Sequence, residues 1–143
     1  MPLCYRFTKN PAYLQQARHI ADFFFGLPNL PEDLVPYWDM KVPGIPDIPR
    51  DASAAACTAS ALYELSTYIP GKNYKETADK IMENLASPAY RAEVGTNGNF
   101  ILMHSVGSIP HGAEIDVPLN YADYYFLEGI MRKRDLESNK KLF

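Results

Sequence analysis

Residues 51–68 read DASAAACTASALYELSTY, and this stretch gives the clearest indication of the fold. Asp51 or Ser53 can cap the free amides at the start of a helix, and Pro70-Gly71 ends that helix. Alanine has the highest helix propensity, and the six alanines here leave small side chains on nearly every face. We therefore predict a helix that is surrounded by other helices, an inner helix.

The stretches on both sides of this helix also predict helices. Asn10 is a candidate N-cap with Pro11 in the first helical position, and Lys75 to Glu83 place charges on one side of an amphipathic outer helix. The alternation of inner and outer helices indicates an all-α fold in which helix hairpins ring a central cavity, a helical toroid. The predicted helical segments are 1–8, 12–25, 74–85, a short helical turn over 87–94, and 121–133, which is apolar on several faces.

Two segments between these helices are predicted to be irregular. Residues 27–50 contain six prolines, but their many apolar side chains predict an ordered loop that packs on the rest of the chain. Residues 107–118 contain Pro110, Gly112 and Pro118, and no long alternating strand pattern is evident. We divide the chain into a partial helical domain, residues 1–134, and a polar tail, residues 135–143.

The composition excludes several classes of function. The net charge of −3 over 143 residues argues against a nucleic-acid partner, which favours a basic surface. No apolar run approaches the roughly 18 residues of a membrane span, and no signal peptide is visible at the start. Cys4 and Cys57 suit isolated buried thiols, so we expect no metal and no cofactor. The localisation stays open between bacterial cytoplasm and periplasm.

Four segments resemble, in order and in spacing, the motifs of one enzyme family. They read VPYWDM (35–40), PRDASAAA (49–56), LMHSV (102–106) and DYYFLEG (123–129). They are similar to the Pro-Tyr-Trp-Asp loop, the Arg-Asp-Ser-Ser-Ala-Ala-Ala helix start, the Leu-x-His-Gly-Val segment and the closing Asp-Tyr-Tyr-Phe-Leu-Glu-Ala helix of glycoside hydrolase family 88, the unsaturated glucuronyl hydrolases. The resemblance extends from about Cys4 to Arg132.

The resemblance implies the C-terminal portion of an (α/α)6 toroid and a hydrolase. Such enzymes remove 4,5-unsaturated uronic acid from the oligosaccharides that lyases release from glycosaminoglycans. An Asp protonates C4 of the double bond, water adds at C5, and the resulting hemiketal breaks down. In the family the catalytic Asp residues, most of the aromatic platform and the uronate-binding Arg lie upstream of the matching stretch. We therefore expect this chain to lack the catalytic acid and to be inactive alone.

The chain departs from the family pattern at two places. Ser105 stands where Gly is usual, directly after His104. In the next loop some members carry Ser-x-x-Ser-x-Lys, which holds a sulfate. Here only Ser108 matches this pattern and Ala113 carries no charge, so the resemblance supplies no sulfate site.

Three candidate substrate-binding residues lie at or before the inner helix. Arg50 and Asp51 sit at its N-terminus, where free amides can meet an anion or sugar hydroxyls; the alternative interpretation is an N-cap and a salt bridge. Trp38 can stack on a sugar face, or it can anchor its apolar loop.

Three further candidates lie towards the C-terminus. His104 can hydrogen-bond the substrate beyond the scissile bond, and a structural His is the competing interpretation. Ser108 and His111 lie on the loop that the family places at the mouth of the cavity. Asp116 and Asp123 do not form a glycosidase carboxylate pair, because Asp123 is near a helix start and nothing places Asp116 opposite it.

Two functional hypotheses remain open. The first is the distal part of an unsaturated glucuronyl hydrolase, whose partner is an unsaturated oligosaccharide. The second is a non-catalytic helical module that binds sugars or a protein; the related hydrolases of family 105 fit the motifs less well. A partial ring leaves inner helices without neighbours, so we also expect the isolated chain to self-associate through apolar side chains at its two ends. These side chains are Leu3, Cys4, Phe7, Tyr124, Phe126, Ile130 and Met131.

Overall fold

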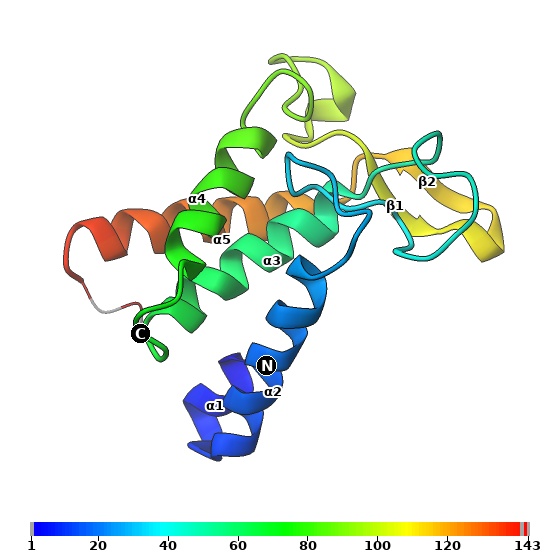
Figure 1. Cartoon of the computed structure of the whole chain (residues 1–143). Coiled ribbons are helices and arrows are strands. Elements are labelled where there is room, and N and C mark those ends of the chain that lie inside the picture. Colours follow the sequence, from blue (N-terminus) through cyan, green and yellow to red (C-terminus); the bar gives the residue numbers. More distant parts are fainter. Residues whose placement is uncertain (1, 141, 143) are drawn as a thin grey trace.

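The computed structural model describes residues 2–140 and 142, and most of these are helical. Figure 1 shows how the elements are arranged, with α3 in the middle of the fold. The helices are α1 (Pro2–Thr8), α2 (Pro11–Phe25), α3 (Ala52–Ser66), α4 (Tyr74–Leu85) and α5 (Asn120–Glu137). Two short 3-10 turns and one antiparallel hairpin follow α4, namely η1 (Asn97–Asn99), β1 (Ser105–Ser108), η2 (Ile109–His111) and β2 (Ala113–Val117).

Helix α3 is the predicted inner helix. It packs against α4 on one side and α5 on another, and its start contacts β1. Ala52, Ala55, Ala56 and Ala59 are fully buried, so their small side chains allow the neighbouring helices to approach closely. Helix α4 is the predicted outer helix, with the bounds that the sequence indicated and one buried apolar face.

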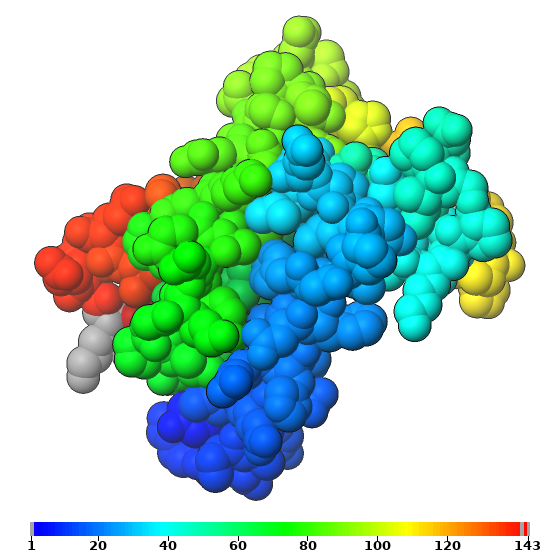
Figure 2. Space-filling model, viewed as in Figure 1, coloured from blue at the N-terminus to red at the C-terminus, as the bar shows by residue number. Residues whose placement is uncertain are grey.

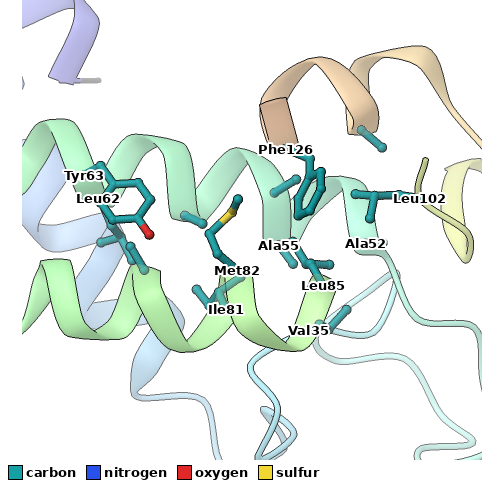
Figure 3. Close-up of a cluster of buried hydrophobic side chains, with 14 of the residues drawn as sticks. Val35, Ala52, Ala55, Leu62, Tyr63, Ile81, Met82, Leu85, Leu102 and Phe126 are labelled. Carbon is teal, nitrogen blue, oxygen red and sulfur yellow. The ribbon is translucent and has the colours of Figure 1, made fainter. Parts of the chain in front are cut away.

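The core lies between α3, α4 and α5. Figure 3 shows Leu62 and Tyr63 of α3 next to Ile81 and Met82 of α4. Each large apolar side chain buried there contributes about 1.5–3 kcal/mol. Gly129 of α5 lies against the same cluster, since a Cβ atom at this position would be 2.9 Å from the Met82 sulfur. A glycine here therefore permits the close approach of α5 to α4.

The loop over residues 27–50 is ordered and packs on the helices, as predicted. Val35 is fully buried, and the Asn84 side chain of α4 donates a hydrogen bond of 2.8 Å to the Asp33 carbonyl. Figure 2 shows this loop, in light blue to cyan, lying beside α2 over the front of the molecule. Because six prolines remove six amide donors, side chains supply much of its hydrogen bonding.

Helix α5 differs from the prediction of a helix buried on several sides. It buries a single face, formed by Ala122, Phe126, Gly129 and Arg132. The prediction that Phe126 is one of the exposed apolar residues at the ends of the chain is therefore wrong, because its ring is buried in the core beside α3. The helix also continues past residue 133 to Glu137, where Leu136 packs on the core and Glu137 pairs with Lys133 at 3.0 Å. The division of the chain at residue 134 stays a prediction.

Two local predictions are wrong and a third holds only in part. Residues 107–118, which we expected to be irregular, belong to a hairpin over 105–117, in which Val106 pairs with Ile115 and Ser108 with Ala113. The helical turn predicted over 87–94 forms only at its start, where the Arg91 amide donates to the Ser87 carbonyl at 2.8 Å. The chain then becomes extended, and Arg91 bridges to Leu102. The two cysteines, which we expected to be buried, are not: Cys4 is half-buried, and Cys57 is exposed because it lines two open grooves beside α3. Among the described residues, no helix is both long and apolar enough to cross a membrane.

Candidate functional site

The first turn of α3 is closed by hydrogen bonds from two directions. Asp51 Oδ1 accepts from the Ser53 amide at 3.0 Å and from the Ser53 hydroxyl at 2.6 Å, which confirms the predicted N-cap. The Ala52 amide donates to the carbonyl of His104 at 2.9 Å. The Val106 amide lies 3.4 Å from the same Asp51 oxygen. The Ala52 and Ser53 amides are thus already paired, and the base of the hairpin is fixed to the helix start.

Arg50 holds the proline-rich loop in place. Its guanidinium forms an ion pair with Asp33, Nε donates to the Val35 carbonyl at 2.8 Å, and its carbon Cζ lies 5.1 Å from the centre of the Tyr37 ring. The salt bridge that the sequence suggested therefore forms with Asp33. The Tyr90 hydroxyl also donates to Asp33, at 2.7 Å; burial and this hydrogen bond both raise the pKa of Tyr90.

His104 faces a carboxylate across the hairpin. Its Nδ1 lies 2.7 Å from Asp116 Oδ1, and the two side chains are 43% and 53% exposed. Both residues have positive φ, +61° for His104 and +54° for Asp116, a conformation that non-glycine residues seldom adopt. The rings of Tyr90 and His104 meet edge to face, with 6.2 Å between ring centres. His104 is therefore held at its backbone and at its ring while part of the ring stays accessible.

Ser108 and His111 come together at the far end of the hairpin. The Ser108 hydroxyl lies 2.6 Å from His111 Nδ1, and Gly112, in the left-handed conformation with φ +64°, closes the turn. Trp38 is half-buried and is held by a backbone hydrogen bond of 3.1 Å to the Pro49 carbonyl. The structure thus brings Asp51 and His104 together and pairs Ser108 with His111. Arg50 adjoins this group, and Trp38 lies in the loop that Arg50 fastens.

Three residues of this arrangement were missed from the sequence as site residues, Asp33, Tyr90 and Asp116. One signal for Asp116 exists, because Ala113-Glu114-Ile115-Asp116-Val117 alternates apolar and polar residues as a strand does. Such a strand, placed after the turn at Gly112, returns towards His104. The sequence contains no comparable signal for the contact of Asp33 with Tyr90, which lies 57 residues further along the chain.

Two grooves lie on the other side of α3, and none of the six candidate residues lines them. The first, of about 360 Å³, is almost wholly apolar and runs between α2 and α3. The second, of about 300 Å³, is bounded by α1, α3 and α5 and contains Glu64, Glu128 and Arg132. Glu64 is 1% exposed and pairs with Arg6 and Arg132, each at 3.3 Å. Since a buried charge needs such partners, this network holds α1, α3 and α5 together.

Comparison with known proteins gives consistent relatives in sequence and in structure. An unsaturated glucuronyl hydrolase of Formosa agariphila is 50% identical over 134 residues, which cover 94% of this chain and 34% of that protein. The crystal structure of an unsaturated glucuronyl hydrolase specific for heparin superposes with a TM-score of 0.92 at 44% identity, over 96% of this chain and 37% of that one.

A second solved structure is a variant of the unsaturated glucuronyl hydrolase of Streptococcus agalactiae in complex with dGlcA-GalNAc6S. It matches with a TM-score of 0.77 at 31% identity, over 92% of this chain and 35% of that one. No protein-family model matches the chain. The chain spans about a third of the length of the curated relatives that it matches.

These structures are α/α toroids, and the mostly helical chain has the fold of a segment of one. The chain therefore belongs to the same family as the unsaturated glucuronyl hydrolases that it matches, and it corresponds to about one third of their length.

Proposed function

We propose that this chain is the C-terminal third of an unsaturated glucuronyl hydrolase and forms part of the wall of its substrate cavity. The observation that carries the proposal is the placement of His104, which is fixed at the start of inner helix α3 with its ring 43% exposed. In a toroid the ends of the inner helices border the central cavity. A half-exposed imidazole at this position can therefore contact a sugar.

The side chains near His104 suit the hydroxyl groups of a sugar. Asp51, Asp116, Ser108 and His111 offer oxygen and nitrogen acceptors, and the nearby guanidinium of Arg50 is paired with Asp33. A uronic acid carboxylate needs a cation or several amide donors. We infer that the remaining two thirds of the enzyme binds this carboxylate and that this chain contacts the saturated sugar beyond the scissile bond.

The same contacts support the absence of the catalytic acid. A general acid must carry a proton and point it at the reacting carbon. Asp51 instead accepts hydrogen bonds from Ser53, and Asp123 accepts from the Ile101 and Leu102 amides at 2.8 and 2.9 Å. Asp116 pairs with His104. These carboxylates serve as acceptors inside the chain, so none of them is poised to protonate C4 of the unsaturated sugar.

The experiment that tests this proposal follows the ultraviolet absorbance of an unsaturated disaccharide with purified chain. We expect no loss of absorbance, because the acid lies outside the chain. As a control for contaminating enzyme, the variant with Asp39→Asn, Asp51→Asn, Asp116→Asn and Asp123→Asn is measured in parallel. Turnover that survives all four substitutions would indicate a contaminating enzyme. Turnover that a single one of them abolishes, measured in the four separate variants, would identify an acid within the chain and contradict the proposal.

A further inference from the structure

We propose that Asp116 is a positioning residue that fixes the tautomer of His104 and presents the imidazole Nε2 as a hydrogen-bond acceptor for a sugar hydroxyl. The sugar contact rests on the function proposed above, whereas the tautomer is a property of the chain itself. The starting observation is the 2.7 Å contact between His104 Nδ1 and Asp116 Oδ1. A carboxylate accepts hydrogen bonds, so Nδ1 is the nitrogen that carries the proton.

The backbone supports this role. His104 and Asp116 both adopt positive φ values, +61° and +54°, and the hairpin has a register shift between Ser105 and Val106, beside His104. Such conformations are unfavourable for non-glycine residues and persist only where the surroundings hold them. Here the Ala52 amide holds the His104 carbonyl at 2.9 Å. His104 and Asp116, which meet across the hairpin, are two of its three non-glycine residues with positive φ; the third is Glu114, with φ +53°.

The chemistry of the pair defines what it can bind. With Nδ1–H donated to Asp116, neutral His104 has a lone pair at Nε2, which accepts a hydrogen bond from a hydroxyl donor. A carboxylate on the far nitrogen fixes the tautomer and the direction of the ring, as it does for histidines that bind metals. A sugar offers hydroxyl groups as donors, so the pair fits a neutral sugar edge.

The test uses nitrogen-15 NMR of the 143-residue chain at about pH 9, where an ordinary imidazole is neutral. We expect His104 to show a protonated Nδ1 and an unprotonated Nε2, while His19, exposed on α2, serves as the internal reference. In Asp116→Gly both His104 nitrogen signals should move towards those of His19. Glycine tolerates the positive φ, so the hairpin keeps its backbone.

Two further variants keep the test decisive. Asp116→Asn also suits positive φ, and its amide can donate to Nδ1, so it should drive the proton to Nε2. Glu114→Gln is the matched control, because Glu114 is an acidic residue of the same strand with φ +53° and should leave both nitrogens unchanged. Unchanged His104 signals in folded Asp116→Gly and Asp116→Asn would overturn the positioning role.

Addition of the disaccharide dGlcA-GalNAc6S separates this inference from the proposed function. In the unsubstituted chain the Nε2 signal should shift more than the Nδ1 signal, and the shift should be lost in Asp116→Gly. If the tautomer depends on Asp116 but the sugar leaves Nε2 unmoved, the sugar contact is overturned and the positioning role stands.

Discussion

The carbonyl of His104 accepts a hydrogen bond of 2.9 Å from the amide of Ala52, which joins the base of the hairpin to the first residue of α3. The amide would otherwise be one of the unpaired donors at a helix start. Because this contact uses the backbone of His104, its imidazole ring does not help to cap the helix. A substitution at His104 that preserves the backbone should therefore affect binding and leave stability unchanged.

His104→Asn tests this separation, since asparagine tolerates the φ of +61°. The background is a chimera in which this chain replaces the matching third of the Formosa agariphila relative. We expect a loss of about 1–3 kcal/mol in transition-state binding, or roughly a 5- to 150-fold lower kcat/KM, because a polar partner of the substrate is removed. The matched control is His19→Asn on α2. A lower melting temperature with unchanged kinetics would instead assign His104 a structural role.

Substitution of two buried serines by alanine should affect stability differently. Ser60 and Ser105 are 1% and 0% exposed, but only Ser60 has a hydroxyl partner within residues 2–140 and 142, the carboxylate of Glu128. Ser60→Ala should lower the free energy of unfolding by about 1–2 kcal/mol, because a hydrogen bond to a charged group is lost. Ser105→Ala should leave it unchanged or raise it by up to about 1 kcal/mol. Urea denaturation measures both, and an equal loss in the two variants would contradict the prediction.

Asp79 should make stability depend on pH in the acid range. Burial opposes its ionisation, but hydrogen bonds from Lys133, Lys75 and Tyr63, at 2.6, 2.8 and 2.8 Å, outweigh burial and lower its pKa. A carboxyl group with a lowered folded-state pKa stabilises the fold fully above its unfolded pKa of about 3.9, and this contribution is lost as pH falls through the folded value.

Asp79→Asn should therefore lower the free energy of unfolding by about 1 kcal/mol at neutral pH, and the difference should shrink as the pH falls below about 4. Urea denaturation between pH 7 and pH 3 measures this. The control is Asp22→Asn, which removes an exposed pair with Arg18 at 3.5 Å and should change little at any pH. A difference for Asp79→Asn that does not vary with pH would show that its charge contributes nothing.

The sequence predicted those elements whose local signals agree with the tertiary packing. The alanines of α3, the two-sided pattern of α4 and the caps Asn10 and Asp51 all act within one helix, and the structure confirms them. The hairpin was missed because its strands have four and five residues and β2 is largely exposed, so no buried face imposes a long pattern. The Asp33–Tyr90 contact depends on residues distant in sequence, which a local pattern cannot reveal.

Exposed apolar side chains predict that the isolated chain self-associates. Leu3 and Tyr124 line the groove between α1, α3 and α5, and both are at least half exposed. Phe7 of α1 and Met131 of α5 are exposed on the same two helices. Burial of apolar surface contributes roughly 25 cal/mol per Å², which favours pairing of these faces. Light scattering at micromolar concentration should show an oligomer that Met131→Glu weakens. Val94→Glu, at an exposed loop position away from the groove, is the control, and a stable monomer would contradict the prediction.

The absorbance assay of the chimera tests the central claim most directly. If the chain is the C-terminal wall of an unsaturated glucuronyl hydrolase, the chimera should remove the unsaturated sugar from a disaccharide that the intact Formosa agariphila enzyme cleaves, whereas the 143-residue chain alone should not. Circular dichroism and light scattering should first establish that the chimera is folded. A folded chimera without activity, or turnover by the chain alone that a single Asp→Asn substitution abolishes, would contradict the account.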